Sequence, residues 1–374
     1  MSSNLKLILM PNIKTFGTLV AENLKIIRGE EDLSIVEVKL DRFSNTEGKA
    51  TLLDSARGKD IFLLSDVGHY GKESEYVSRG QTFMRSADDH FQDIKRVISA
   101  MNGKENSLHV VTPLLYASRQ DKRKGCESLD CSEALRELES RGVDGIITFD
   151  VHNPAIENAL QNCSFDNLFP TYSILNRFIQ DEEYSPNNLM VVAPDTGAMD
   201  RAIYYSNALG VDVGVFYKRR DFTTVVNGKN PIVEHVYLGS DVKGKDLIIT
   251  DDMIASGGSI LEVATDMKSR GANKIYLVAT FPLFTEGQKS IEAFDKAKEE
   301  GIFERLYTTN VTYVPEEIKQ KEWYKEVDCS KYLAKIINAI YERESIKPFL
   351  DCKTKITEKM KTLGKYPNKN VTTK

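Results

Sequence analysis

Residues 247–260 read LIITDDMIASGGSI, and this stretch decides how the rest of the sequence is interpreted. A run of buried-strand residues ends in the acidic pair Asp251-Asp252, and the small residues 255–259 then lead into a helical pattern. Glycines let a backbone approach an anion closely, hydroxyls add donors, and a helix N-terminus presents unpaired N–H groups with a favourable dipole. The stretch therefore predicts a phosphate cup beside two carboxylates that can accept hydrogen bonds from sugar hydroxyls. An ordinary turn rich in small residues, with solvated aspartates, is the alternative.

Short apolar runs alternate with amphipathic stretches along almost the whole chain. Nine runs have the composition of strands: 5–10, 34–38, 61–65, 108–112, 145–149, 190–193, 213–216, 247–250 and 275–280. Because helical periodicity lies between them, the pattern predicts an α/β fold with mainly parallel sheets flanked by helices. We expect a domain boundary near 164–171. The lysine-rich residues beyond about 350 are expected to form a solvated or frayed tail.

The bulk properties exclude several classes of protein. The 374 residues suffice for about two domains, and 41% hydrophobic with 28% charged residues is typical of globular proteins. A net charge of −5 gives no basic bias towards nucleic acid, and no apolar run is long enough to cross a membrane. Five scattered cysteines without a Cys-x-x-Cys pair indicate neither a disulfide framework nor a zinc site. We expect a cytoplasmic protein whose partners are neither nucleic acid nor membrane.

A basic segment, residues 217–220 (YKRR), follows the strand candidate 213–216 and precedes a polar stretch, 221–231. Cations at the start of a mobile loop suit closure over a polyphosphate, where they neutralise charge that develops as a phosphorus–oxygen bond breaks. A solvated basic turn is the alternative for an isolated triplet, although this one lies just upstream of the phosphate cup. No Gly-x-x-x-x-Gly-Lys-Ser/Thr sequence occurs, so a Walker-type loop is not expected to hold ATP.

Six segments follow one another along the chain, each beside a predicted strand end. They are 42–47 (RFSNTE), 116–121 (YASRQD), 148–152 (TFDVH), 193–197 (APDTG), the basic segment and the acidic pair with its small-residue turn. In this order they resemble the motifs of the ribose-phosphate pyrophosphokinase (phosphoribosyl pyrophosphate synthetase) family, over about residues 5–350. The resemblance implies two type I phosphoribosyltransferase-like domains, 1–168 and 169–350, followed by a tail, 351–374.

The resemblance also implies an activity. Such an enzyme transfers the pyrophosphoryl group of Mg-ATP to the anomeric hydroxyl of ribose 5-phosphate, which gives phosphoribosyl pyrophosphate and AMP for nucleotide and amino-acid biosynthesis. ATP and ribose 5-phosphate would be the substrates, Mg²⁺ the cofactor, and dimers or hexamers of this chain the assembly. The N-terminal domain would carry the ATP contacts and the subunit packing, and the C-terminal domain the ribose 5-phosphate loop and the catalytic loop.

Roles for the residues of the N-terminal domain follow from the same resemblance. Phe43, Asn45 and Glu47 would meet the adenine in the neighbouring subunit's site, since an aromatic face, an amide and a carboxylate suit a flat heterocycle with an amino group. Arg119 and Gln120 would contact ATP, because arginine offers a planar fork to phosphate oxygens. An exposed hairpin and a solvated turn are the respective alternatives. Two more residues, Ser55 and Arg57, resemble part of a regulatory phosphate and ADP site.

The remaining roles concern the metal, catalysis and the sugar phosphate. His152 and Asp195 would lie at the Mg²⁺ site, and the carboxylate is chemically the easier ligand because Mg²⁺ prefers oxygen. A structural histidine is the alternative for His152. Lys218 and Arg220 would stabilise the transition state. Ribose 5-phosphate would be bound by Asp195, Asp251, Asp252, Ser256, Gly257, Gly258 and Ser259.

The sequence departs from the family pattern at four places. Ala255 stands where the family usually has aspartate, Ser118 is inserted before Arg119, residues 122–131 diverge from the usual basic continuation, and the segment 66–87 is longer than usual. Alanine at this point is common in phosphoribosyltransferases that consume phosphoribosyl pyrophosphate, so such an enzyme is one alternative, although it leaves the N-terminal motifs unexplained. A non-catalytic regulatory subunit of a synthetase complex is another, against which the retained basic and acidic residues argue.

Overall fold

The computed structural model describes residues 4–30, 35–123, 125–220 and 232–367, and for 218–220 and 232–235 it describes the backbone only. The chain forms two compact units. Unit 1 contains the described residues of 1–170 together with 310–315 and 328–350. Unit 2 contains those of 171–309, 316–327 and 351–374. Each unit is built on its own sheet, so two cores form.

The sheet of unit 1 has five parallel strands that follow one another in chain order across the sheet. They are β1 (Leu5–Leu9), β4 (Asp60–Leu64), β7 (Ser107–Val111), β8 (Gly145–Phe149) and β9 (Ser164–Leu168). Its helices are α1 (Lys14–Arg28), α2 (Ala87–Met101), α3 (Asp130–Ser140), α9 (Ser330–Tyr341) and α10 (Lys347–Leu350), with short 3-10 turns at Pro11–Ile13, Lys72–Ser74 and Pro154–Ala159. The predicted strands 5–10, 61–65, 108–112 and 145–149 match β1, β4, β7 and β8, each within a residue.

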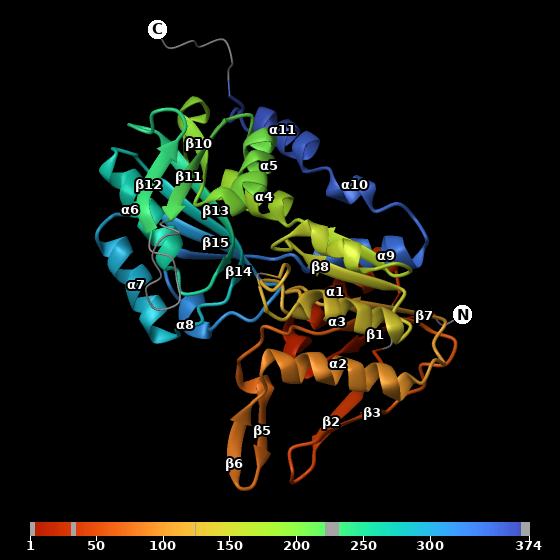
Figure 1. The fold of residues 1–374 in the computed structure, drawn as a ribbon. Helices are drawn as coiled ribbons and strands as arrows, with labels where there is room; N and C mark the ends of the chain where they lie inside the picture. The colour runs from red at the N-terminus through yellow and green to blue at the C-terminus, as the bar shows by residue number, and fades with distance from the viewer. Residues whose placement is uncertain (1–3, 31–34, 124, 221–231, 368–374) are drawn as a thin grey trace. The chain divides into compact units, whose positions relative to one another are not determined.

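Two antiparallel hairpins also belong to unit 1. One joins β2 (Val38–Arg42) to β3 (Gly48–Leu52), and the other joins β5 (Glu75–Ser78) to β6 (Gln81–Met84). Figure 1 shows both hairpins on the same side of α2. The strand predicted at 34–38 was wrong, because the described part of that segment makes only a single bridge, Leu7 to Ile35, and regular pairing begins at Val38.

Helix α9 belongs to unit 1 although it lies late in the sequence, within the range predicted for the C-terminal domain. Its N-terminal Ser330 accepts a hydrogen bond from Asn23 at 3.0 Å. Arg28, at the end of α1, donates to Asn338 at 2.9 Å and pairs with Glu342 at 2.6 Å. The helix therefore packs along α1, and the chain returns to unit 1 after the last strand of the second sheet.

The sheet of unit 2 has seven strands in the order β12-β11-β10-β13-β14-β15-β16, all parallel except β12. The strands are β10 (Leu189–Ala193), β11 (Asp212–Arg220), β12 (Ile232–Leu238), β13 (Asp246–Ile254), β14 (Ile275–Pro282), β15 (Arg305–Thr309) and β16 (Tyr324–Val327). The helices are α4 (Thr171–Asp181), α5 (Met199–Leu209), α6 (Gly258–Ser269), α7 (Gln288–Glu299), α8 (Glu316–Lys319) and α11 (Cys352–Thr362), with 3-10 turns at Pro186–Asn188 and Thr196–Ala198. Strands β10 and β14 are buried throughout, as expected for a sheet covered on both faces.

The strand order reverses at β10 and β13, which are parallel neighbours in this sheet, because the next strand along the chain is added on opposite sides of them. After β10 the chain crosses through α5 to β11 on one side, and after β13 it crosses through α6 to β14 on the other. Right-handed crossovers in opposite directions place their helices on opposite faces of the sheet. The carboxyl ends of β10 and β13 therefore form a topological switch point, the usual place for a ligand in an open α/β sheet.

The expectation of a solvated or frayed tail after residue 350 was wrong for residues 352–362. This segment forms α11, in which Cys352, Ile356 and Met360 recur every four residues and are all buried. The helix packs against α4 and α5, as Figure 1 also shows. Lys365 follows it and donates to the carbonyl oxygens of Ile179 and Glu182 at 3.0 and 2.7 Å. The apolar spacing of a helix face outweighed the lysine-rich composition.

Within the described residues, no helix combines the length and the apolar character that a membrane span requires.

The packing of α11 is tested by Ile356→Ala, because the isoleucine is fully buried. We expect a loss of about 2–4 kcal/mol in the free energy of unfolding, since a buried isoleucine leaves a cavity that the surroundings fill only in part. Chemical denaturation measures this loss. The exposed Lys353→Ala on the same helix should change stability by less than about 0.5 kcal/mol. Equal stability of both variants would show that α11 does not pack on the unit.

Candidate functional site

The acidic residues of unit 2 meet at the switch point. Asp195 follows β10 after one residue, and Asp251 and Asp252 lie near the end of β13, the neighbouring strand. The predicted strand ended at Thr250, which would place the acidic pair after the strand. Strand β13 in fact runs on to Ile254, so the acidic pair is part of the strand. Asp252 is buried and Asp251 is half-buried. Two segments that are more than fifty residues apart thus supply carboxylates to one place.

The turn between β13 and α6 has the geometry of an anion-binding turn. Gly257 has a φ of 83°, and a Cβ built there would lie 2.3 Å from Cε2 of Phe294, so only glycine fits this position. Its neighbour Gly258 begins α6, and the Gly258 N–H donates to Ser256 Oγ at 3.4 Å. Gly258 and Ser259 are exposed, at the end of a twelve-residue helix whose dipole favours an anion.

Asp195 holds the turn after β10. Its Oδ1 accepts hydrogen bonds from the N–H groups of Gly197 and Ala198 at 2.8 and 3.2 Å. The carboxylate thereby caps the short 3-10 turn that leads into α5. Oδ2 takes part in neither bond, and the side chain is half-buried. Asp195 is therefore fixed in place and still able to offer an oxygen to a ligand.

The carboxylates at this edge repel one another. Burial raises the pKa of Asp251, and the Asp252 carboxylate raises it further, with a smaller contribution of the same sign from Asp195. The Arg201 guanidinium and a hydrogen bond from the Asp252 N–H to Asp251 Oδ1 at 2.9 Å act in the opposite direction. A ligand that brings positive charge or hydroxyl donors would relieve this repulsion.

Arg201 is a residue of this site that the sequence analysis missed. It lies in the first turn of α5, six residues after Asp195, and its charge lowers the pKa of Asp251. The sequence shows an arginine in an early helical turn after a motif, which is too common a feature to single out. Only the pairing of β10 with β13 brings this helix start next to the acidic pair.

The basic segment lies on a strand and not in a loop. Strand β11 extends to Arg220 and pairs with β12, with Lys218 opposite His235 and Arg220 opposite Ile232, and with an irregularity between Arg219 and Arg220. The prediction that a loop begins at residue 217 was therefore wrong, because the antiparallel partner β12 continues the ladder. The side chains of Lys218 and Arg220, and the polar stretch 221–231, lie outside the described residues.

The residues predicted to meet adenine form the exposed turn between β2 and β3. Phe43 is 54% exposed, and Asn45 and Glu47 are exposed as well. The turn is closed by bonds from Thr46 N–H to Phe43 O and from Phe43 N–H to Glu47 O, both 2.8 Å. The three residues thus lie together on one exposed hairpin end.

Arg119 and Gln120 follow a tight turn in unit 1 and are both exposed. Ala117 adopts a left-handed φ of 53°, and the inserted Ser118 is buried, so the extra residue is absorbed inside the turn. Tyr116 anchors this segment: its ring stacks on Phe91 at 4.4 Å, and its hydroxyl donates to Asp88 at 2.7 Å.

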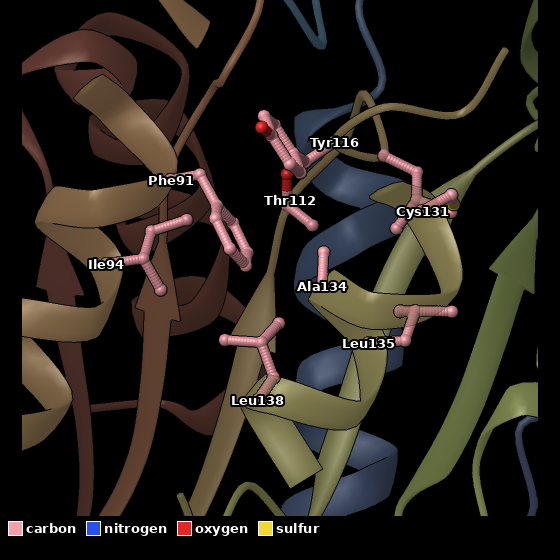
Figure 2. A pocket seen from close by; sticks show the side chains of 9 residues that line it. Phe91, Ile94, Thr112, Tyr116, Cys131, Ala134, Leu135 and Leu138 are labelled. Atoms are coloured by element: carbon pink, nitrogen blue, oxygen red, sulfur yellow. The ribbon is translucent and has the colours of Figure 1, made fainter. Parts of the chain in front are cut away.

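A small cavity lies beneath this anchor. Figure 2 shows Tyr116 and Phe91 at one end of the cavity, with side chains of α2 and α3 around it. Its volume of about 10 Å³ has room for roughly one water molecule. Burial raises the pKa of the lining Cys131 thiol to about 12, so this cysteine is an unreactive packing residue. The cavity lies within the packing that anchors the Arg119–Gln120 segment, and it is too small for a substrate.

His152 is exposed and follows β8 after two residues, Asp150 and Val151. Asp150 is buried with a left-handed φ of 39°, so the backbone turns sharply at the strand end. Asn153 donates to the carboxylate of Asp121. This bond ties the segment of His152 to that of Arg119 and Gln120, so the structure brings two of the predicted N-terminal motifs together.

The predicted regulatory residues, Ser55 and Arg57, are exposed in the segment between β3 and β4, where the Arg57 N–H donates to Ser55 Oγ at 3.3 Å. The predicted metal residues lie in different units, His152 in unit 1 and Asp195 in unit 2. Among the residues that the structure describes, no three His, Cys, Asp or Glu side chains cluster as a metal site.

Two family models match the sequence. The model of the N-terminal domain of ribose phosphate pyrophosphokinase matches residues 5–142, and that of the phosphoribosyl synthetase-associated domain matches residues 223–350. Together the two models cover most of the chain.

Individual proteins agree with these models. The chain is 27% identical to a ribose-phosphate pyrophosphokinase of Vibrio parahaemolyticus over 342 residues, 90% of this chain and 98% of the relative. It is 24% identical to the enzyme of that name from Staphylococcus epidermidis, over 94% of this chain and 98% of the relative. The solved phosphoribosylpyrophosphate synthetase of Mycobacterium smegmatis shares the fold, with a TM-score of 0.74 at 22% identity over 91% of this chain and 100% of that one. The predicted family and fold class are confirmed.

The burial of the Asp251 carboxylate and the repulsion around it predict that Asp251→Asn stabilises the free protein. A carboxyl whose pKa is raised on folding costs no stability below its unfolded pKa, near 4, and its full cost appears as the pH rises above the folded pKa. The gain in Tm should therefore be near zero at about pH 4.5 and reach about 2–4 °C at about pH 9.

Asp246→Asn provides the matched control for this measurement by thermal unfolding. Asp246 is a buried carboxylate of the same strand, and its Oδ1 accepts hydrogen bonds from Asn273 Nδ2 and the Lys274 N–H at 2.8 and 3.2 Å. Asparagine keeps the Oδ1 acceptor but removes the charge that strengthens both bonds, so the Tm should not rise. A lower Tm for Asp251→Asn at about pH 9 would contradict the proposed repulsion.

Proposed function

The chain belongs to the ribose-phosphate pyrophosphokinase family, and we propose that it transfers the pyrophosphoryl group of Mg-ATP to the anomeric hydroxyl of ribose 5-phosphate. The products are phosphoribosyl pyrophosphate and AMP. The observation that carries this proposal is the switch point of unit 2, where three carboxylates stand beside a glycine turn and a helix N-terminus. A sugar phosphate has hydroxyls that can donate to the carboxylates, and a phosphate that the glycine turn and the helix N-terminus can bind.

Ribose 5-phosphate binds, in this proposal, along the end of β13. The phosphate lies at the start of α6, where Ser256, Gly257, Gly258 and Ser259 supply backbone N–H groups and hydroxyls. The sugar hydroxyls donate to Asp251 and Asp252, with Asp195 as a third acceptor nearby. Each of these groups is fixed by the strand or by a turn before the substrate arrives, so little ordering remains to be done on binding.

ATP is bound by groups of unit 1. Phe43, Asn45 and Glu47 contact the adenine from the turn between β2 and β3, in the site of a neighbouring copy of the chain. Arg119 and Gln120 contact the phosphates, to which the arginine fork is matched. The exposure of all five side chains supports these roles, because each remains accessible to a ligand.

Mg²⁺ fits the chemistry of the residues at the switch point. Magnesium usually keeps several waters and takes one or two carboxylates together with substrate phosphates, so a three-ligand protein cluster is not required. Asp195 is the protein ligand that we propose, and a role of His152 at the metal stays a prediction from the family resemblance. When bound, Mg²⁺ would neutralise charge on the triphosphate. The raised pKa of Asp251 supports a cation at this edge, because a positive charge favours the ionised carboxylates.

The reaction is an in-line displacement. The anomeric oxygen attacks the β-phosphorus of ATP and loses its proton, while the bond from that phosphorus to the α-phosphate oxygen breaks and AMP leaves. The protein holds the two anionic substrates in line, and Lys218 and Arg220 stabilise the charge that spreads over the transferred group. No covalent intermediate is needed.

The proposal also covers the location of the protein in the cell, its assembly and a regulatory anion site. All five cysteines are free thiols, which supports a cytoplasmic location, where thiols stay reduced. A homo-oligomer is required if the adenine turn serves a neighbouring copy. Ser55 and Arg57 remain a prediction for a regulatory anion.

The products distinguish this proposal from other kinase chemistry. Purified protein incubated with Mg-ATP and ribose 5-phosphate should give AMP and phosphoribosyl pyrophosphate in equal amounts, measured by ion-exchange chromatography and ³¹P NMR. ADP as the sole nucleotide product would refute pyrophosphoryl transfer. Release of pyrophosphate that requires phosphoribosyl pyrophosphate and a nucleobase would identify a phosphoribosyltransferase instead.

Lys218→Ala tests the proposed transition-state contact. We expect kcat to fall at least ~100-fold with little change in the Kd for ribose 5-phosphate, because the charge is needed mainly as the bond breaks. Arg219→Ala removes a cation from the next residue of β11 and should cost far less. If Lys218→Ala turned over at the wild-type rate, this lysine would have no part in the reaction.

A further inference from the structure

The hairpin β5–β6 touches the turn that carries the adenine residues. Ser78, at the end of β5, donates a hydrogen bond from Oγ to the carbonyl oxygen of Ser44 at 3.2 Å. Ser78 is only 6% exposed, although its neighbour Val77 is 71% exposed. The hairpin therefore has one face covered by the β2–β3 turn and one face open to solvent. It lies within the segment 66–87, the part of the chain that is longer than in the family pattern.

A second contact joins the hairpin to the residue just before the turn. The guanidinium carbons of Arg42 and Arg85 lie 5.5 and 5.4 Å from the ring centre of Tyr76. These are cation–π distances, and they put Tyr76 of β5 against both arginines. Tyr76 in turn stacks on Phe83 of β6 at 5.5 Å, so both strands of the hairpin support its ring.

Arg42 itself is held rigidly. Its guanidinium makes a bidentate pair with Asp93 of α2, at 3.0 and 2.7 Å, and its side chain is 3% exposed. Arg96 and Arg85 approach the same carboxylate at 2.7 and 3.5 Å. The single negative charge of Asp93 thus lies among three positively charged guanidinium groups. The negative electrostatic potential over the Tyr76 ring offsets part of this excess positive charge. The end of β2 is fixed by this network.

The base of the hairpin is anchored to unit 1 by a buried polar cluster. Ser74 Oγ lies 2.7 Å from His69 Nδ1 and 2.9 Å from His90 Nε2, and Ser74 is fully buried. The Arg85 N–H, just after β6, donates to the Ser74 carbonyl oxygen at 2.8 Å, which closes the hairpin at the same base. Because Ser74 before β5 and Arg85 after β6 are both tied to the unit, the base is fixed and the hairpin can hold the turn that its tip touches.

We propose that the β5–β6 hairpin is a positioning element of the nucleotide site, in which Ser78 and Tyr76 fix the Phe43–Glu47 turn in the orientation that receives adenine. This inference rests on the proposed function. Neither residue contacts the nucleotide: Ser78 holds the backbone of the turn, and Tyr76 holds Arg42. A turn that is ordered before binding loses less conformational freedom when ATP arrives, so the hairpin should raise ATP affinity and leave ribose 5-phosphate affinity unchanged.

The test compares four variants of the full chain. Ser78→Ala removes the hydrogen bond, Tyr76→Leu removes the ring, Ser78→Thr keeps the hydroxyl, and Val77→Ala changes the solvent face of the same strand. The measurements are KM for each substrate, kcat, and the Kd for Mg-ATP in the absence of ribose 5-phosphate.

We expect Ser78→Ala and Tyr76→Leu to raise KM and Kd for ATP about 2- to 10-fold, the range of one lost hydrogen bond or cation–π contact. KM for ribose 5-phosphate should stay within about twofold of wild type, since that site lies in the other unit. Ser78→Thr should restore ATP affinity, and Val77→Ala should match wild type. Hydrogen exchange of peptide 43–47 should quicken in Ser78→Ala alone among the Ser78 variants.

Failure of the inference can be told from failure of the proposed function. If the wild type makes AMP and phosphoribosyl pyrophosphate but Ser78→Ala and Tyr76→Leu keep wild-type ATP affinity, the hairpin has no positioning role and the function stands. If the wild type makes no AMP yet binds ATP, and Ser78→Ala weakens that binding while Ser78→Thr does not, the positioning role stands alone. A parallel rise in the KM of both substrates would overturn the inference, because it would indicate a general loss of structure.

Discussion

The reversal of strand order at the parallel neighbours β10 and β13 is the constraint on which the candidate site depends. It sends α5 and α6 to opposite faces of the sheet and leaves the ends of the two strands side by side. Asp195 comes from one strand end and Asp251 with Asp252 from the other, so carboxylates gather where burial and mutual repulsion raise the pKa of Asp251. The free protein carries a destabilising charge arrangement at this edge, which a sugar with hydroxyl donors or a cation would relieve. The same gathering of carboxylates therefore lowers the stability of the free protein and provides the acceptors that bind the sugar or the cation.

The parts of the site that follow from local chemistry could be predicted from the sequence. Gly257 must be glycine because of its left-handed backbone and the nearby Phe294 ring, and the small-residue run around it already indicated a close turn. The strand candidate 145–149 was confirmed as β8 with the same bounds, because five consecutive buried residues leave little ambiguity. The exposed turn at residues 43–47 and the turn at 116–121 also lie beside strand ends, as their order along the chain had indicated.

The features that were missed depend on contacts between distant segments. Nothing near Arg201 in the sequence shows that its helix begins next to Asp251. Strand β11 runs past Phe216 only because β12 pairs with it, and the hairpin β5–β6 is held by Asp93, Ser74 and the turn of another hairpin. In α11 the spacing of Cys352, Ile356 and Met360 was visible, but the many lysines concealed it until α4 and α5 gave the apolar face a partner.

The central claim is that the turn after β13 receives the phosphate of ribose 5-phosphate while the acidic pair receives its hydroxyls. A crystal structure of the protein with ribose 5-phosphate alone tests it most directly. The account predicts phosphate oxygens within hydrogen-bond distance of the backbone N–H groups at 257–259, and ring hydroxyls against Asp251 and Asp252. A sugar phosphate bound elsewhere, with this turn empty, would contradict it.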